Sequence, residues 1–202
     1  MIIIGLTGPS GSGKTTLCDI AKAMGIESID ADKVYHALLI PPSPCLDEIA
    51  QAFGSGVLLS NGMLDRAALG SIVCVDESGE RLSTLNRITH KYVKARFREL
   101  IALLEAEGKK TVIVDAPTLF ESGFDEECTF TIAILADDAL RRERIISRDS
   151  LSEERAELRL SAQKNDEFFI SHAGYTLYNE GNKDSLAKAF YDILKRGGFD
   201  EN

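Results

Sequence analysis

The stretch from Ile2 to Met24 constrains this chain more than any other part. It opens with an apolar run containing three consecutive isoleucines, which is typical of a strand buried on both faces of a parallel sheet. The residues that follow, Gly8-Pro9-Ser10-Gly11-Ser12-Gly13-Lys14-Thr15, satisfy the pattern G-x-x-x-x-G-K-[ST] at every position. Apolar residues then recur at the spacing of one helix face, at Leu17, Ile20, Ala21 and Met24. The glycines therefore lie between a strand and a helix, which is the setting in which this pattern binds phosphate.

The chemistry of this loop follows from its residue types. Glycines allow the backbone to curl so that successive N–H groups point at an anion, and the following helix N-terminus adds partial positive charge. Lys14 is placed to contact the β- and γ-phosphates, and the Thr15 hydroxyl to bind Mg²⁺. We therefore predict a nucleoside triphosphate site formed by the residues from Gly8 to Thr16. The alternative is a flexible turn with a solvated lysine, which the intact pattern and its flanks argue against.

Composition narrows the class of protein. The 202 residues carry a net charge of −9, with a sequence pI near 4.9, which argues against nucleic acid or an anionic membrane as the main partner. The four cysteines are widely spaced and form no C-x-x-C pair, so we expect a reducing cytoplasm. No basic leader and no apolar stretch of membrane-spanning length is evident, so we expect no membrane association.

Strands and helices are expected to alternate along the chain. After the loop and its helix we predict a strand ending at Asp30 and a helix from Lys33 to about Leu39. Further helices are expected at about 44–53, 65–74 and 81–107, and through Leu186–Leu194, and further strands at 111–115, 129–135 and 175–178. This order predicts an α/β fold of the P-loop NTPase class, with a parallel sheet covered by helices on both faces. We expect a single domain, with its core at about 1–43, 108–140 and 165–202, a helical insert at 44–107 and a lid at 141–164.

Three acidic residues follow predicted strands. Asp30 and Asp32 stand at the carboxyl end of the second strand, where α/β proteins place their ligands. Either carboxylate would take a proton from an attacking hydroxyl or hold a metal-bound water, but an Asp before a helix is also a favoured N-cap. We expect one of the two to be only a cap. Asp115 ends the strand Val112-Ile113-Val114, a pattern that favours a second Mg²⁺ contact but occurs in many other strands.

One segment is locally basic. From 141 to 164 there are seven basic residues against five acidic ones, in a chain that is acidic overall. Arg144 and Arg148 are four residues apart on one predicted helix face, where they would close over transferring phosphates. The alternative is a solvated face of paired charges.

The class of P-loop protein is narrowed by missing motifs. A GTPase would need N-K-x-D, which Asn182-Lys183-Asp184-Ser185 misses by one position. Asp76-Glu77-Ser78-Gly79 spells D-x-x-G but lies in an acidic turn away from any predicted strand. A small-molecule kinase is left, with a P-loop core, a helical insert for the acceptor and an arginine-bearing lid.

Further short motifs occur in a fixed order from about residue 4 to residue 181. They are Gly5-Leu6-Thr7-Gly8, Ile29-Asp30-Ala31-Asp32, Phe53-Gly54, Gly62-Met63-Leu64-Asp65-Arg66 with Leu69, Leu85-Asn86 with Ile88 and His90, Pro117 with Leu119-Phe120-Glu121, Arg144 with Arg148-Asp149, Arg159 with Gln163, and Asn179 with Gly181. Taken together, they resemble the dephospho-coenzyme A kinase family, whose members use ATP and Mg²⁺ to phosphorylate the ribose 3′-hydroxyl in the last step of coenzyme A synthesis.

The resemblance implies a role for each matching residue. Asp32 would be the base facing the 3′-hydroxyl, and Lys14 and Arg144 would stabilise the transferring phosphoryl group. Arg148, Asn179 and Gly181 would bind ATP. The remaining implied residues would hold the acceptor, dephospho-coenzyme A, together with Asp32: Asp65, Arg66, His90, Leu119, Phe120 and Glu121.

Three positions depart from the family pattern. Lys91 follows His90 where the family usually has proline, Thr118 follows Pro117 where it usually has leucine, and Gly174 replaces an aspartate before Asn179. Two alternatives stay open from sequence, namely a P-loop kinase for another small molecule and a non-catalytic nucleotide-binding switch. We expect a monomer.

Overall fold

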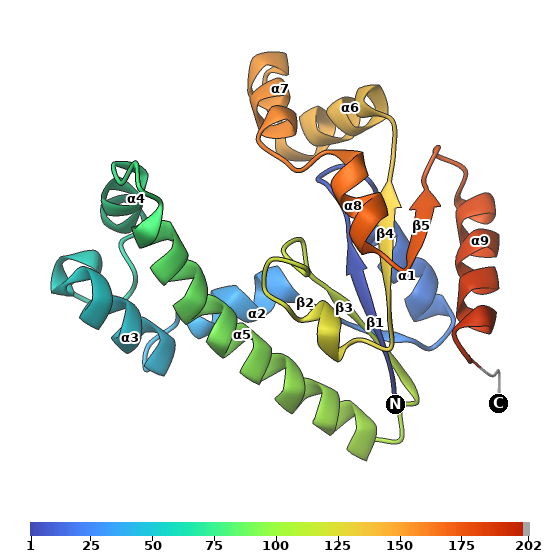
Figure 1. Ribbon diagram of the computed structural model, residues 1–202, viewed down its shortest axis with the longest axis horizontal. Helices are drawn as coiled ribbons and strands as arrows, with labels where there is room; N and C mark the ends of the chain where they lie inside the picture. The colour runs from blue at the N-terminus through green and yellow to red at the C-terminus, as the bar shows by residue number, and fades with distance from the viewer. Residues whose placement is uncertain (200–202) are drawn as a thin grey trace. The chain divides into compact units, whose positions relative to one another are not determined.

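The computed structural model describes residues 1–199 (Figure 1). Contacts divide the chain into two compact units, one made of Met1–Ile29 and the chain from Leu104 onward, the other of Asp30–Leu103. We refer to them as the first and the second unit.

The sheet belongs to the first unit. Its strands run in the order β2-β3-β1-β4-β5, and they are β1 (Ile2–Thr7), β2 (Glu27–Asp30), β3 (Thr111–Asp115), β4 (Phe130–Leu135) and β5 (Tyr175–Tyr178). The pairings of β1 with β3, β1 with β4 and β4 with β5 are parallel. The central strand β1 therefore has neighbours on both sides, and the loop that follows it lies at the carboxyl edge where such sheets bind ligands.

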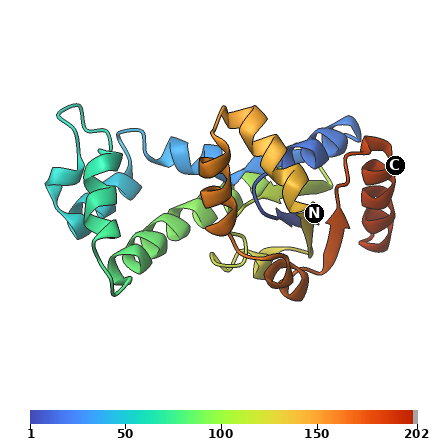
Figure 2. The same ribbon diagram turned by 90° about the horizontal axis from the view of Figure 1, so that it is seen from above.

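Both faces of this sheet are covered. On one face, β-strand residues such as Ile4, Ile132 and Leu177 pack against α1 (Lys14–Ala23) and α9 (Lys183–Arg196). On the other face, Ala133 and Leu135 pack against Phe169 of α8 (Asp166–His172). Figure 2 shows α1 and α8 on opposite sides of the strands. The predicted class, a parallel sheet between helices, is confirmed.

Two further helices of the first unit follow β4. They are α6 (Asp138–Asp149) and α7 (Glu153–Ser161), and they are joined through Ser150, which has a positive φ of 51°. The Arg142 guanidinium pairs with Glu157 at 2.8 Å, which links the two helices. The sequence predicted the helical face of α6 but not α7 or α8 as separate helices.

The second unit is helical. It contains α2 (Ala31–Leu38), α3 (Pro44–Phe53), the 3₁₀ turn η1 (Ser55–Val57), α4 (Arg66–Cys74) and most of α5 (Glu80–Ala106). A second 3₁₀ turn, η2 (Asp125–Glu127), belongs to the first unit. The core of the second unit is formed by Leu39, Cys45, Leu46, Ile49, Val57, Leu69 and Ile88.

Local capping explains where these helices begin. Ser43 caps α3 and accepts a hydrogen bond from the Leu46 N–H, with Pro44 at the first helical position, where its missing N–H costs nothing. Asp30 caps α2, so that helix begins at Ala31, two residues before the predicted start at Lys33. The predicted helix over 65–74 likewise begins at Arg66, because Asp65 is its cap. A capping side chain satisfies the first N–H groups, and the helix then starts at the next residue.

Candidate functional site

The P-loop has a shape that only glycine allows at two of its positions. Gly8 has a φ of 139°, and a Cβ there would lie 2.2 Å from the Ile134 carbonyl oxygen. Gly13 has a φ of 108° and is the N-cap of α1, and a Cβ there would lie 2.0 Å from the Asn179 side-chain nitrogen. Strand β4 and the loop after β5 therefore crowd the P-loop backbone, and the conformation also favours glycine.

Polar groups of the loop suit a bound phosphate. Lys14 is the first residue of α1, and its Nζ donates to the Gly8 carbonyl at 2.8 Å and the Pro9 carbonyl at 3.4 Å. The ammonium therefore lies within the curve of the loop. The Ser12 hydroxyl is buried and has no hydrogen-bond partner among the described residues. The Lys14 ammonium and the N-terminus of α1 suit an anionic ligand.

Thr15 and Asp115 are the predicted magnesium ligands. Thr15 is exposed in the first turn of α1, and Thr16 follows it half-buried. Asp115 ends β3 in register with Leu6 of β1, and its Oδ2 lies 3.9 Å from the Cys18 Sγ, one turn further along α1. Among the described residues, no cluster of three or more His, Cys, Asp or Glu could hold a metal. Mg²⁺ at phosphate sites commonly takes only one or two protein oxygens, so this pair still fits it.

Arg144 contacts the backbone of the P-loop directly. Its Nη1 donates to the Gly11 carbonyl at 3.0 Å and the Ser12 carbonyl at 3.4 Å, and its Nη2 to the Asn179 carbonyl at 3.3 Å. The guanidinium therefore joins the P-loop to the loop after β5. The alternative of a solvated charge is wrong for Arg144.

Asn179 is a second link between these loops. Its buried side chain donates from Nδ2 to the Ser12 carbonyl at 2.9 Å, and its Oδ1 accepts from the Gly181 N–H at 3.2 Å. Gly181 adopts a positive φ of 98°, so the turn after β5 also suits glycine. The structure thus brings together four parts predicted from distant sequence: the P-loop, Arg144, Asn179 and Gly181.

Arg148 is more exposed than Arg144. It makes two hydrogen bonds of 2.8 Å to the Asp149 carboxylate and one of 3.3 Å to the Ser10 hydroxyl. Asp149 also accepts from Arg159 at 2.6 Å. The hydrogen bonds between Arg148 and Asp149 raise the pKa of the arginine and lower that of the carboxyl, so both groups are held in their charged forms.

Arg141 is 4% exposed and was not among the site residues predicted from sequence. Its Nε donates to the Ser10 carbonyl at 3.1 Å, and its Nη2 to the side-chain oxygen of Gln163 at 3.1 Å. Gln163 was noted only as part of a motif. Arg141 lies three residues before Arg144, so the same helix-face argument, extended by one turn, would have included it.

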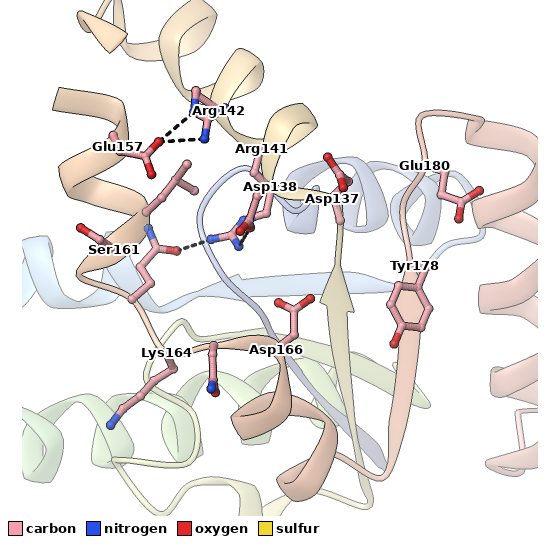
Figure 3. Close-up of a pocket in the computed structure, with 14 residues that line it drawn as sticks. Asp137, Asp138, Arg141, Arg142, Glu157, Ser161, Lys164, Asp166, Tyr178 and Glu180 are labelled. Carbon is pink, nitrogen blue, oxygen red and sulfur yellow. Dashed lines mark hydrogen bonds and ion pairs between the residues drawn. The ribbon is translucent and has the colours of Figure 1, made fainter. Parts of the chain in front are cut away.

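A cavity of about 740 Å³ adjoins this region (Figure 3). It lies among α6, α7, the start of α8 and the end of β5, and Arg141 and Gln163 form part of its wall. Figure 3 shows the ion pairs Arg141–Asp138 and Arg142–Glu157 at its border. None of the site residues predicted from sequence lines this cavity.

In the second unit, Asp30 and Asp32 have different surroundings. Asp30 is the N-cap of α2, where its side chain accepts from the Lys33 N–H at 3.1 Å and pairs with the Lys33 ammonium at 3.2 Å. Asp32 lies exposed in the first turn of the same helix. The expectation that one of the pair is a cap is therefore confirmed, and it is Asp30. The catalytic role of Asp32 stays a prediction.

The other second-unit residues lie on helix ends and surfaces. Asp65 caps α4 by accepting from the Ala67 and Ala68 N–H groups, each at 3.0 Å. The exposed Arg66 lies against His36, with 2.7 Å between its Nη2 and the His36 Nδ1. His90 is half-buried within α5. The structure therefore gives Asp65 a capping role in addition to its predicted one.

The departure at Lys91 leaves α5 unbroken. The Lys91 ammonium pairs with the Glu48 carboxylate at 2.6 Å, and the Tyr92 hydroxyl donates to the same oxygen at 2.8 Å. These hydrogen bonds lower the pKa of Glu48. A proline at position 91 could not form the ion pair with Glu48. The lysine therefore adds a contact between α5 and α3 within the second unit.

The segment after β3 has mixed burial. Leu119 is fully buried and its Cδ2 would lie 2.7 Å from a Cβ at Gly5, so it fills space that this glycine leaves. Phe120 is half-buried against Phe168 and His172, with ring centroids 6.0 and 5.4 Å away. Glu121 and Thr118 are exposed. The other departure, Gly174, donates its N–H to the Thr131 hydroxyl at 2.9 Å.

Comparisons with known proteins agree with this geometry. The profile of a family described as dephospho-CoA kinase matches residues 2–185. The dephospho-CoA kinase of Corynebacterium diphtheriae is 35% identical over 97% of this chain and 97% of its own length. The crystal structure of TT1252 from Thermus thermophilus superposes with a TM-score of 0.80 at 30% identity, covering 96% of this chain and 97% of that one. The dephospho-CoA kinase structure from Campylobacter jejuni gives a TM-score of 0.65 at 28% identity, covering 96% of each chain.

A parallel sheet whose central strand leads into an intact P-loop, with an arginine on the loop's carbonyls, defines a P-loop kinase. The matches to curated relatives over nearly the whole chain narrow this class. The chain belongs to the dephospho-CoA kinase family.

Proposed function

We propose that this protein transfers the γ-phosphoryl group of ATP to the ribose 3′-hydroxyl of dephospho-CoA, giving coenzyme A and ADP. The observation that carries the proposal is the P-loop, held by Arg144 and Asn179, in a chain of this family. Among residues 1–199, no helix combines the length and the hydropathy that crossing a membrane requires.

The nucleotide side of the site belongs to the first unit. We propose that Arg148, Asn179 and Gly181 bind ATP together with the P-loop and the first helical turn after it. The residues of the loop and this turn are Gly8, Pro9, Ser10, Gly11, Ser12, Gly13, Lys14, Thr15 and Thr16. When bound, ATP supplies the phosphoryl group and Mg²⁺ neutralises its charge. Thr15 and Asp115 would hold the metal, while Lys14 and Arg144 would stabilise the negative charge that grows on the equatorial oxygens.

The acceptor-binding residues are proposed from the family to which the chain belongs. Asp32 would accept the proton of the 3′-hydroxyl, and its exposure leaves the carboxylate open to a ligand. The family pattern implies six further residues that would hold the rest of dephospho-CoA: Asp65, Arg66, His90, Leu119, Phe120 and Glu121. Binding energy far from the hydroxyl would help to position it.

The remaining assignments are proposals from sequence. We propose the organisation into a core, a helical insert at 44–107 and a lid at 141–164, and a monomer with no nucleic-acid partner. A cytoplasmic location is supported by the four cysteines, which are widely spaced in the sequence and form no C-x-x-C pair.

An acceptor panel tests the proposed function. ADP release is followed with ATP, Mg²⁺ and either dephospho-CoA, adenosine, AMP or no acceptor. We expect dephospho-CoA to give by far the highest kcat/KM, with the new phosphate at the 3′ position by NMR. Comparable kcat/KM for adenosine would favour a nucleoside kinase, and turnover that is independent of any acceptor would favour a nucleotide-binding switch.

A further inference from the structure

Ser10 of the P-loop is bonded to the segment that follows β4. Its N–H donates to the Gln163 side-chain oxygen at 2.7 Å, and its carbonyl accepts from Arg141 Nε at 3.1 Å. Its hydroxyl accepts from Arg148 at 3.3 Å. All three polar groups of this one residue are therefore bonded to side chains from residues 141–163.

Arg141 and Gln163 also bond to each other. The Gln163 side-chain oxygen accepts from both Arg141 Nη2, at 3.1 Å, and the Ser10 N–H. The Gln163 side-chain nitrogen donates to the Arg159 carbonyl at 2.8 Å, which fixes the orientation of the amide. The third arm of the Arg141 guanidinium pairs with Asp138 at 2.7 Å. Arg141, Gln163 and Ser10 thus form a closed triangle of hydrogen bonds.

The backbone of Gly11 also lies close to that of Arg141. A Cβ at Gly11 would lie 2.7 Å from the Arg141 carbonyl oxygen, so the first turn of α6 lies directly on the P-loop. The side chain of Arg141 is 5% exposed, whereas that of Arg148 is 55% exposed. Burying a guanidinium is costly unless its donors are satisfied, and here each of its three nitrogens has an acceptor.

We propose that Arg141 and Gln163 are positioning residues, which hold both sides of the Ser10 peptide and so set the shape of the P-loop for its nucleotide. The inference rests on the proposed function only in taking that nucleotide to be ATP. Neither residue needs to contact a phosphate. The two act by restricting the backbone from Pro9 to Gly11, so the loop loses less conformational freedom when it binds.

This role predicts an effect confined to one substrate. A loop that is no longer held at Ser10 binds ATP more weakly, because ordering it then costs binding free energy. The affinity for the acceptor stays the same. A purely structural role would instead lower the melting temperature and leave the KM of each substrate unchanged in the folded fraction.

The test compares Arg141→Met with Arg142→Met. Arg142 is the next residue on α6 and makes a half-exposed ion pair with Glu157, which contributes little. Titration calorimetry with ATP and steady-state kinetics are measured on both purified variants. For Arg141→Met we expect the Kd and KM of ATP to rise by roughly 10- to 100-fold, the size of a lost charge-assisted hydrogen bond, with the KM of dephospho-CoA unchanged. For Arg142→Met we expect wild-type values.

Gln163→Ala provides an independent variant, because Gln163 is half-buried and lies between α7 and α8. It should raise the Kd of ATP in the same direction even if Arg141→Met does not fold. The double variant should then be about as weak as the worse single variant, because both side chains hold the same peptide. Additive losses, or wild-type ATP binding in Gln163→Ala, would overturn the proposal.

The wild-type protein separates this inference from the proposed function. If it binds ATP but does not phosphorylate dephospho-CoA, the proposed function fails while the calorimetric comparison still decides the role of Arg141. If it phosphorylates dephospho-CoA and both variants bind ATP normally, only the inference fails.

Discussion

The two units hold their candidate site residues in different ways. In the first unit, Arg144 and Asn179 are bonded to main-chain carbonyls of the P-loop, and the Asn179 side chain is buried. In the second unit, Asp32 and Arg66 are exposed on helices, and Arg66 contacts another side chain, that of His36. Backbone contacts fix a side chain more firmly than exposed side-chain pairs do, because the backbone is itself held by the sheet.

This difference indicates a division of labour. A phosphate site needs many N–H groups at fixed positions, so it gains from a rigid loop. An acceptor site built on exposed helix residues can order itself around a larger molecule at some entropic cost. We therefore expect substitutions at the P-loop and its contacts in the first unit to act through ATP and phosphoryl transfer. We expect substitutions at the second-unit candidates Asp32 and Arg66 to act through the acceptor.

Asp32 is the strongest test of this division, because it is an exposed second-unit residue with a proposed chemical role. Asp32→Asn keeps the size of the side chain and removes the base, so we expect kcat to fall by roughly 10²–10⁴ with the melting temperature unchanged. Steady-state kinetics with saturating substrates measure this. Asp30→Asn is the control, since asparagine also caps helices well. A larger loss of kcat in Asp30→Asn would reverse the two roles.

Lys14 gives the corresponding test in the first unit. Lys14→Ala removes the ammonium that lies within the P-loop, and we expect kcat to fall by about 10²–10³, the cost of one transition-state contact of this kind. The exposed Lys22, on the same helix, supplies the control Lys22→Ala, for which we expect normal turnover. Near-normal kcat in folded Lys14→Ala would contradict the proposed role.

Arg66 tests whether the second unit acts through the acceptor. Arg66→Ala should raise the KM of dephospho-CoA by about 10- to 100-fold through the loss of a charged hydrogen-bond donor, while the KM of ATP stays constant. Arg96 is the control, because it is exposed on α5 and pairs at 2.8 Å with Glu99, three residues further along the same helix. If Arg66→Ala raised the KM of ATP instead, the second-unit residue would not act through the acceptor, and the proposed difference between the units would be wrong.

The smallest expected effect is a change in melting temperature when one carboxylate in each unit is replaced. Hydrogen bonds lower the pKa of Glu48 in the second unit, through Lys91 and Tyr92, and that of Asp149 in the first, through Arg148. A lowered folded-state pKa stabilises the protein above the unfolded-state pKa, and this contribution is lost as pH falls through the folded-state value. Glu48→Gln and Asp149→Asn should each lower the melting temperature slightly at pH 7.

Melting curves between pH 7 and pH 3 measure this pH dependence. The difference between each variant and the wild type should shrink as the pH falls below the ordinary carboxyl pKa, because the unfolded wild-type chain then binds a proton that the folded carboxylate resists. A difference that stays constant with pH would show that the carboxylate charge contributes nothing.

Much of the fold followed from local sequence. The strands predicted at 111–115 and 175–178 have the observed bounds, and the helix predicted at 81–107 is shifted by one residue at each end. Alternation, helix-face spacing and cap residues act over a few positions, so they are visible in sequence. Two predicted helix starts, at Lys33 and Asp65, were wrong by one or two residues. An aspartate that caps a helix and an aspartate inside its first turn cannot be told apart in sequence before the hydrogen bonds are known.

The candidate site also has parts that follow from local sequence and parts that do not. The P-loop could be predicted from sequence, because its glycines and Lys14 act within eight consecutive residues, and the helix-face spacing predicted the position of Arg144. Three contacts became visible only in the folded chain: Arg141 is buried against Ser10, Gln163 bonds to the same peptide, and the Asn179 side chain reaches Ser12. These contacts join residues 131, 153 and 167 positions apart. They exist because β1, β4 and β5 bring their carboxyl ends to one edge of the sheet, and no local pattern records which distant side chain will meet the loop there.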